Sequence, residues 1–376
     1  FAEEEFTPIK KILFNVKVEG QHHDLHYNNW SEIGQQILGP MPESECKMLA
    51  QTFCPVEIQS VTQLSGRGNS RIYRVLTGSG NAYALKSYPD LLIDPRLRLR
   101  NEVKACGLLE HLRLTPRSVA HDEELNLALF EWVDGEVPGT IETTHIDQAL
   151  AFVKILKNCS EGFQNEFPEA SEACLSGAEL FFQVQERIRK LESINNLELQ
   201  NFLQTSIKPL WDEIQEWSES KWPAVSFGKE LTQSKQMLSP SDFGFHNSLQ
   251  RIDGSLCFID LEYFGRDDPV KLIADFLWHP AMDLKPAHET QWLRGMFGIF
   301  DQDLELPQRF RAAWPLYGMR WALIMLNEFR QDGWQKRVHA KQELQQGRKR
   351  RQQRQLRKAA EVCDRIRGEK LECPYV

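Results

Sequence analysis

The spacing of apolar residues predicts a strand-rich part of the chain followed by a helix-rich part. Short apolar segments separated by polar or glycine-containing loops are typical of β-strands, and five occur, at 61–64, 72–76, 82–86, 118–121 and 125–132. Between the third and fourth, Asp94-Pro95 supplies a helix N-cap and a first-turn proline. Apolar residues then follow at helical spacing up to residue 112, which predicts one helix inside the strand-rich part.

Beyond residue 133 the apolar residues take on helical spacing. A hairpin expected over 247–260, with its turn at Asp253-Gly254, separates two helical stretches at 145–219 and 270–335. The whole pattern indicates an α+β fold. Its four expected parts are an N-terminal appendage at 1–55, a small β-rich lobe at 56–133, a helical lobe at 134–335 and a basic C-terminal helix at 336–376.

Composition narrows the class of protein but names no function. The chain has 376 residues, of which 41% are hydrophobic and 26% charged, as in ordinary globular proteins. A net charge of −8 argues against broad binding to nucleic acid or anionic membranes. The eight cysteines form no C-x-x-C pair, and no apolar run approaches the roughly 18 residues of a membrane span. We therefore expect a soluble, cytoplasmic protein with reduced thiols.

Two segments of the strand-rich part carry groups that suit a phosphate ligand. Gly66 and Gly68 lie in a loop between expected strands, where backbone N–H groups can approach phosphate oxygens closely. An ordinary hairpin turn has the same composition, so this signal is weak by itself. Lys86 ends the third expected strand, and Glu102 lies on the following helix, where it can hold that lysine by an ion pair. A surface lysine and a solvated glutamate are the alternative interpretation.

The most informative segment lies between Ser239 and Phe264. Asp242 is followed five residues later by Asn247, and Asp260 comes after one expected hairpin. Phosphoryl transfer needs a carboxylate that orients the attacking hydroxyl and oxygen ligands that hold Mg²⁺. The three residues together supply these groups.

This arrangement resembles the aminoglycoside phosphotransferase and choline kinase family, whose members are small-molecule kinases with a protein-kinase-like fold. The resemblance covers about residues 56–335. It implies a two-lobed fold that binds ATP and Mg²⁺ and phosphorylates a hydroxyl group of a small molecule. It also implies that Asp242 is the catalytic base, that Asn247 and Asp260 bind the metal, and that Glu262 supports a second metal ion.

The same resemblance assigns residues that bind the nucleotide. It matches Gly66 and Gly68 to the phosphate loop, and Lys86 and Glu102 to the phosphate-pairing lysine and its partner. The adenine-contacting segment that links the lobes corresponds to Phe130, Glu131 and Val133. Asp275 is similar to a downstream aspartate that has a structural rather than a catalytic part in the family.

Two features complicate the motif. Asp242-Phe243-Gly244 spells the magnesium-binding tripeptide of protein kinases, but a catalytic aspartate would then lie about twenty residues upstream. Residues 220–238 contain no Asp, so we take the tripeptide as coincidental.

Pro240 stands where the family usually has a histidine that braces the loop, and this departure is the one support for a catalytically silent kinase-like protein. His246 is a candidate to compensate for the missing histidine or to contact substrate.

The acceptor is less well defined by the sequence. Residues 139–235 contain fifteen acidic and nine basic residues, which suits a cationic aminoglycoside but equally a set of solvated helices. Tryptophans can enclose a quaternary ammonium group or belong to the core, and four lie in the second helical stretch: Trp278, Trp292, Trp314 and Trp321. A sugar, an amino sugar, an amino alcohol and an aminoglycoside all stay open as acceptors.

Two further segments offer alternatives from other classes of function. Eight Lys or Arg residues lie between Lys341 and Lys358, which could make the C-terminal helix a binding surface for RNA or for a partner protein. No aromatic residues interleave them, so a solvated helix is the favoured interpretation. A cluster in the N-terminal appendage, formed by His22, His23, Asp24 and His26, is a weak candidate for a metal site.

Overall fold

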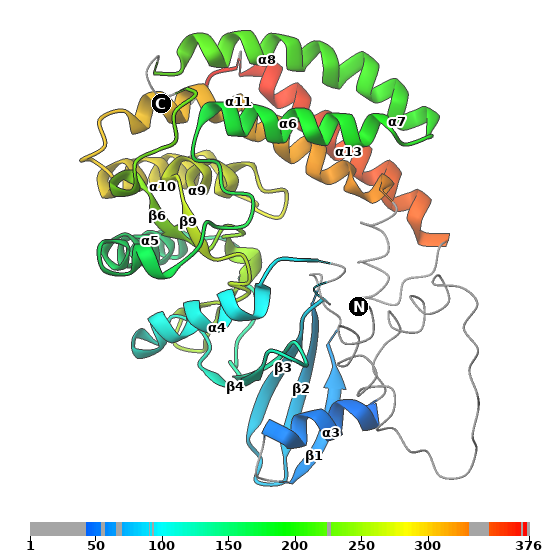
Figure 1. Ribbon diagram of the computed structural model, residues 1–376, viewed down its shortest axis with the longest axis vertical. Coiled ribbons are helices and arrows are strands. Elements are labelled where there is room, and N and C mark those ends of the chain that lie inside the picture. Colours follow the sequence, from blue (N-terminus) through cyan, green and yellow to red (C-terminus); the bar gives the residue numbers. More distant parts are fainter. Residues whose placement is uncertain are drawn as a thin grey trace, which may run out of the picture.

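A computed structural model describes residues 43–53, 57–64, 70–89, 91, 94–223, 227–330, 346–369 and 371–373. The histidine-rich segment at 22–26 and the two loop glycines, Gly66 and Gly68, lie outside these residues. The described part forms a sheet-containing lobe and a larger helical lobe, which lie at opposite ends of the molecule in Figure 1.

The smaller lobe is built on one antiparallel sheet with the strand order β1-β2-β3-β5-β4. Its strands are β1 (Ile58–Gln63), β2 (Arg71–Thr77), β3 (Ala82–Ser87), β4 (Ser118–Asp122) and β5 (Leu127–Glu131). Side chains of β2 alternate between buried and more exposed positions, and this alternation specifies the register against its neighbours. Lys86 on β3 thereby lies opposite Ile72 on one side and Ala128 on the other.

Two helices accompany the sheet. Helix α3 (Glu43–Phe53) packs Cys46 and Ala50 against apolar side chains of the sheet that include Ile58 and Leu85. Helix α4 (Arg98–Leu109) lies between the sheet and the helical lobe in Figure 1, and η1 (Glu110–Leu112) continues it. Since Glu102 is on the buried face of α4, its carboxylate points into the protein rather than into solvent.

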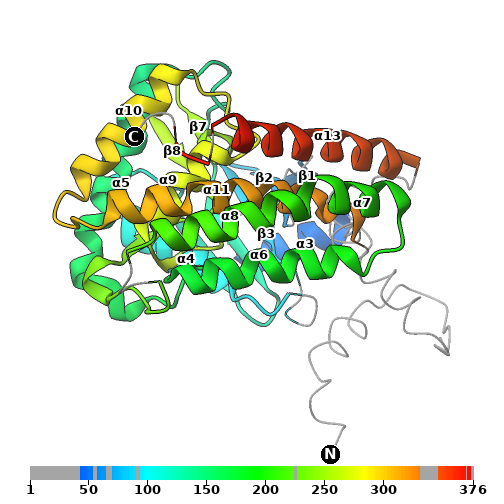
Figure 2. The same ribbon diagram turned by 90° about the horizontal axis from the view of Figure 1, so that it is seen from above.

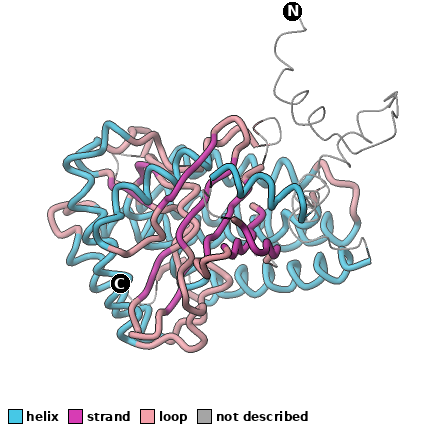
Figure 3. Tube along the Cα trace, turned by 90° about the horizontal axis from the view of Figure 1, so that it is seen from below, coloured by secondary structure: helices cyan, strands magenta, loops and turns pink. Residues whose placement is uncertain are grey.

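The larger lobe is mainly helical. Its helices are α5 (Thr143–Phe163), α6 (Gly177–Glu192), α7 (Leu197–Phe202), α8 (Lys208–Lys221), α9 (Pro269–Trp278), α10 (Pro286–Ile299), α11 (Leu306–Met325) and α13 (Gln346–Gly368). Short helical turns are η2 (Gln164–Glu166), η3 (Leu203–Ile207), η4 (Gln233–Lys235), η5 (Phe245–Asn247) and η6 (Leu326–Phe329). Helices α6, α8, α11 and α13 run side by side in Figure 2, while Figure 3 shows the sheet lying in front of the helical lobe.

Two small strand pairs inside the helical lobe carry the segment singled out from the sequence. Strand β6 (Met237–Ser239) pairs with β9 (Gly265–Asp267), and β7 (Ser248–Gln250) pairs with β8 (Leu256–Phe258). The hairpin expected over 247–260 is therefore present, and Gly254 occupies its turn with a φ of +82°, a conformation that favours glycine. None of the described helices combines the length and the apolarity needed to cross a bilayer.

Helix α9 forms the centre of the helical lobe, because every one of its residues is buried. Asp268 caps its N-terminus by accepting a hydrogen bond from the backbone N–H of Val270 at 2.9 Å, and Pro269 occupies the first turn. The last turn of α9 leads directly to His279, which is thereby attached to a well-packed helix.

Three of the four tryptophans considered for an ammonium cage belong to the core. Trp278, Trp292 and Trp314 are 3%, 0% and 0% exposed. Trp292 stacks on Phe276 with ring centroids 3.9 Å apart. A cage that used these three side chains is excluded, and the core interpretation is confirmed for them. Trp321 is partly buried and faces His279.

The basic helix α13 is part of the helical lobe. Ala359, Cys363 and Ile366 are almost fully buried, and they pack in the main apolar core. Gly318 on α11 permits this approach, since a Cβ there would lie 2.9 Å from Ile366 Cδ1. The guanidinium of Arg365 lies over the ring of Trp278 at 4.4 Å. The favoured interpretation of a solvated helix is therefore wrong for one face, because it rested on the basic residues at 341–358, whereas the buried residues follow them at helical spacing.

We expect Ile366→Ala to destabilise the protein by about 2–5 kcal/mol, because it removes a buried side chain between α11 and α13. Glu361 lies on the exposed face of the same helix, so Glu361→Ala serves as the control, with a change within about 0.5 kcal/mol. Chemical denaturation measures both values. Equal stabilities for the two variants would contradict the packing of α13 against the lobe.

Candidate active site

The loop that carries Asp242 leaves β6 at Ser239 and is braced by a buried lysine. The Lys271 ammonium donates a hydrogen bond to Ser241 Oγ at 2.9 Å. It also lies 3.3 Å from Asp267 Oδ2 and 3.2 Å from Asp275 Oδ2. These carboxylates raise the pKa of Lys271, although burial opposes its charge. The loop is therefore held from α9 despite Pro240, which replaces the family's histidine.

Aromatic residues anchor the same loop in the core. Phe243 and Phe245 are 4% and 3% exposed, and the Phe243 ring lies parallel to that of Phe152 with centroids 5.5 Å apart. The tripeptide Asp242-Phe243-Gly244 thus supplies a core anchor at its centre. The next residue is Gly244, and only glycine fits there without a shift of its neighbours, because a Cβ would lie 2.7 Å from His246 Nδ1.

Asn247 joins this loop to the hairpin that leads to Asp260. Its side-chain amide donates to the main-chain oxygen of Asp242 at 3.0 Å. The backbone N–H of Ile259 donates to the main-chain oxygen of Asn247 at 2.9 Å. Within the described part of the chain, Asn247 Oδ1 makes no hydrogen bond, so it is free to contact a ligand.

A second cluster surrounds the ammonium of Lys86. Its Nζ lies 2.6 Å from Glu102 Oε2 and 3.2 Å from Glu262 Oε2, and it also contacts the carboxylate of Asp260. Burial disfavours this charge, but Asp260, Glu102 and Glu262 together raise the pKa of Lys86 well above its usual value. The hydroxyl of Tyr88 donates to Glu102 at 2.8 Å, which holds the glutamate in place.

The two acidic residues after the hairpin differ in their surroundings. Both oxygens of Glu262 already have partners: Oε1 accepts from Arg98 at 2.6 Å, and Oε2 accepts from Ser70 at 2.8 Å. The side chain of Asp260 is 28% exposed, and its backbone has a φ of +64°. Asp260 is thus the carboxylate of this cluster that can reach a ligand.

The accumulation of negative charge makes the cluster suitable for a cation. Ligand oxygens of Glu102, Asp260 and Glu262 lie within 4.8 Å of one another. Burial, together with the charges of Glu262 and Glu102, raises the pKa of Asp260 even though Lys86 opposes the shift. Carboxylate oxygens are the ligands that Mg²⁺ prefers, and a divalent cation would relieve this repulsion.

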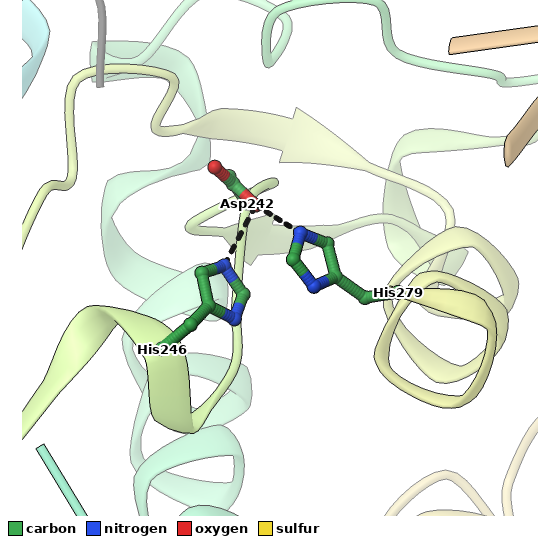
Figure 4. Close-up of side chains that lie close together, drawn as sticks. All are labelled: Asp242, His246 and His279. Atoms are coloured by element: carbon green, nitrogen blue, oxygen red, sulfur yellow. Dashed lines mark hydrogen bonds and ion pairs between the residues drawn. The ribbon is translucent and has the colours of Figure 1, made fainter. Parts of the chain in front are cut away.

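Asp242 lies in a separate group with two histidines, shown in Figure 4. Its Oδ1 is 3.2 Å from His246 Nε2 and 3.7 Å from His279 Nε2. Burial raises the pKa of Asp242, but the His246 hydrogen bond and the nearby positive charges outweigh it and lower the pKa to about 2. Asp242 is therefore ionised at neutral pH.

Three of the remaining residues expected from the sequence lie at or just after the end of β5, and Asp275 lies on α9. Phe130 is buried near the end of β5, while Glu131 and Val133 are partly exposed. The Glu131 N–H donates to the main-chain oxygen of Arg117 at 2.9 Å. Asp275 accepts from Trp321 Nε1 at 2.8 Å and pairs with Lys271, in keeping with a structural part.

Sequence reasoning missed several residues of the site. His279, Lys271, Arg98 and Tyr88 all contact expected site residues, but none belongs to a recognisable spacing pattern. The available signal for His279 was a histidine directly after an apolar helix and four residues beyond Asp275.

Comparison with known proteins identifies the family. The model of the phosphotransferase enzyme family matches residues 60–299, a span that contains both clusters. No curated protein matches the chain by sequence. Structural similarity extends to the choline kinase LicA from Streptococcus pneumoniae, which is 15% identical with a TM-score of 0.51, over 85% of this chain and 97% of that one.

Two other solved structures have the same architecture. A spectinomycin phosphotransferase in complex with ADP and spectinomycin is 11% identical with a TM-score of 0.58, over 87% of this chain and 98% of that one. An ethanolamine kinase from Plasmodium vivax is 16% identical with a TM-score of 0.51, over 90% and 95% of the two chains. The expected two-lobed, kinase-like fold is confirmed. With the family match over both clusters, this chain belongs to the phosphotransferase enzyme family, as an enzyme with the fold of the small-molecule kinases.

Proposed function

We propose that this enzyme transfers the γ-phosphoryl group of ATP, in the presence of Mg²⁺, to a hydroxyl group of a small molecule. The observation that carries the proposal is the link between the two clusters. The side-chain amide of Asn247 donates a hydrogen bond to the main-chain oxygen of Asp242. The main-chain oxygen of Asn247 accepts one from the backbone N–H of Ile259, the residue before Asp260. A base and a metal-binding carboxylate held by one residue suit phosphoryl transfer.

Lys86 is proposed to pair with the phosphates of the nucleotide. Glu102 restrains its ammonium from the buried face of α4, so the lysine stays charged and in one position. The proposed phosphate loop contains Gly66 and Gly68. Phe130, Glu131 and Val133 form the proposed adenine-contacting segment, with the buried Phe130 contributing through its backbone.

Asn247 and Asp260 are the proposed Mg²⁺ ligands, because each offers an oxygen atom that can reach a ligand. Bound Mg²⁺ would supply positive charge that offsets the negative charge of the phosphates during transfer. Glu262 is proposed to support the metal site through its negative charge nearby rather than as a direct ligand, since Arg98 and Ser70 already occupy its oxygens.

Asp242 is proposed to orient the acceptor hydroxyl and to accept its proton as the new O–P bond forms, while the bond from the γ-phosphorus to the β,γ-bridging oxygen breaks and ADP leaves. Its low pKa keeps the carboxylate ionised and able to accept a hydrogen bond from the hydroxyl. The side chain is 36% exposed, which leaves room for an acceptor to reach it.

The proposed acceptor is a sugar, an amino sugar, an amino alcohol or an aminoglycoside. Burial of Trp278, Trp292 and Trp314 removes the aromatic cage that would favour a choline-like acceptor. ADP release measured with representatives of all four classes, followed by mass spectrometry of the product, tests the proposal. Absence of Mg-dependent phosphoryl transfer to every compound would overturn it.

We expect Asp242→Asn to lower turnover by about 10²–10⁴, because the amide cannot accept the hydroxyl proton. Binding of MgATP should stay close to that of the wild type, since Asp242 lies in the other cluster. Asp301→Asn, at an exposed position, is the matched control. A fully active Asp242→Asn enzyme would remove Asp242 from the chemistry.

Asp260→Asn should weaken binding of ATP in Mg²⁺ much more than binding of ATP in EDTA, because it removes a carboxylate ligand of the metal. Titration calorimetry with the nucleotide under both conditions measures the difference. If the substitution changes both affinities equally, Asp260 does not bind the metal.

A further inference from the structure

We propose that His246 and His279 act as a pair of positioning residues whose Nε2 atoms hold Oδ1 of Asp242, His246 by a hydrogen bond and His279 by a longer contact, and leave Oδ2 to receive the acceptor hydroxyl. The inference rests on the proposed function and deepens it, because it assigns the two histidines as positioning residues. One comes from η5, beside the catalytic loop, and the other follows α9 (Figure 4).

The first observation is that both rings converge on one oxygen atom. The Nε2 atoms of His246 and His279 lie 3.2 Å and 3.7 Å from Asp242 Oδ1. Within the described part of the chain, Asp242 Oδ2 has no hydrogen-bond partner. The two oxygens of one carboxylate therefore have different surroundings.

The second observation concerns the position of the ring protons. His279 Nδ1 accepts the backbone N–H of Ala281 at 3.1 Å, so a neutral His279 carries its proton on Nε2. His246 Nδ1 is buried with no hydrogen-bond partner among the described residues, while its Nε2 faces a carboxylate oxygen. The favourable tautomer of His246 also carries the proton on Nε2. His246 can thus donate to Asp242, while the Nε2–H of His279 faces the same oxygen from 3.7 Å, beyond hydrogen-bond distance.

The third observation is the stacking of the two rings. Their centroids are 3.8 Å apart, with an interplanar angle of 2°. Two imidazolium ions at this separation would repel one another strongly, so the arrangement disfavours two charged rings at the same time. Burial, and after it the nearby His246, lowers the pKa of His279 to about 4, in agreement with a ring whose Nδ1 accepts a hydrogen bond.

The pair is itself held from several directions. The ring of Trp321 meets His279 edge-on at 4.5 Å, and Trp321 Nε1 donates to Asp275 at 2.8 Å. On the other side, Gly244 leaves the space beside His246 that a Cβ would fill. These contacts restrict rotation of both rings, and the rings in turn restrict rotation of the Asp242 carboxylate.

Phenylalanine and glutamine variants separate the effect of the histidine N–H group from the effect of the aromatic ring. His279→Phe keeps an aromatic ring but removes the N–H, whereas His279→Gln keeps an N–H donor at a similar distance from the backbone. We expect His279→Phe and His246→Phe each to lower kcat by between about 10- and 10²-fold through misplacement of the base. KM for ATP should stay unchanged, and the corresponding glutamine variants should recover most of the lost kcat.

Thermal unfolding of each variant shows whether it is folded. Folded phenylalanine variants with wild-type kcat would overturn the inference, as would glutamine variants that are as impaired as the phenylalanine ones. A wild-type enzyme that transfers no phosphoryl group would instead refute the proposed function itself. An enzyme that depends on Asp242 but not on either histidine N–H would refute only this inference.

Discussion

The buried ammonium of Lys86 is the interaction on which the rest of the site depends. It comes from the central part of the sheet, and its three carboxylate partners come from α4 and from the segment after β8. A single charge thereby ties the smaller lobe to the helical lobe. Loss of one partner from a buried ion pair typically costs about 3–5 kcal/mol, because the remaining charge is left uncompensated. The position of Asp260 relative to the sheet follows from this constraint.

A second buried lysine explains how the loop that carries Asp242 is held despite Pro240. The loop needs a brace, and Lys271 provides one from the most buried helix of the lobe. Asp267 and Asp275 flank this lysine within 3.3 Å, so its charge is compensated as that of Lys86 is. Two buried lysines with acidic neighbours thus hold the two halves of the site, one for each cluster.

Local sequence patterns predicted much of this structure. The turn at Gly254 and the strand alternation around Ile72 depend on neighbouring residues, and both are present as expected. The pairing of Lys86 with Glu102 was expected from a lysine at the end of a strand and a glutamate on the next helix, and the ion pair is present. His279 could not be predicted, because its ring meets His246 only after α9 packs beside the loop. Periodicity also cannot tell a buried tryptophan from a ligand-facing one, so the core position of Trp292 needed the tertiary structure.

The contact between Arg365 and Trp278 links the end of the chain to the chemistry. Trp278 directly precedes His279, and the guanidinium of Arg365 on the C-terminal helix lies over its ring. A change in this helix that moved Trp278 would therefore shift the His279 ring beside Asp242, the proposed base, from a position on the other side of α9.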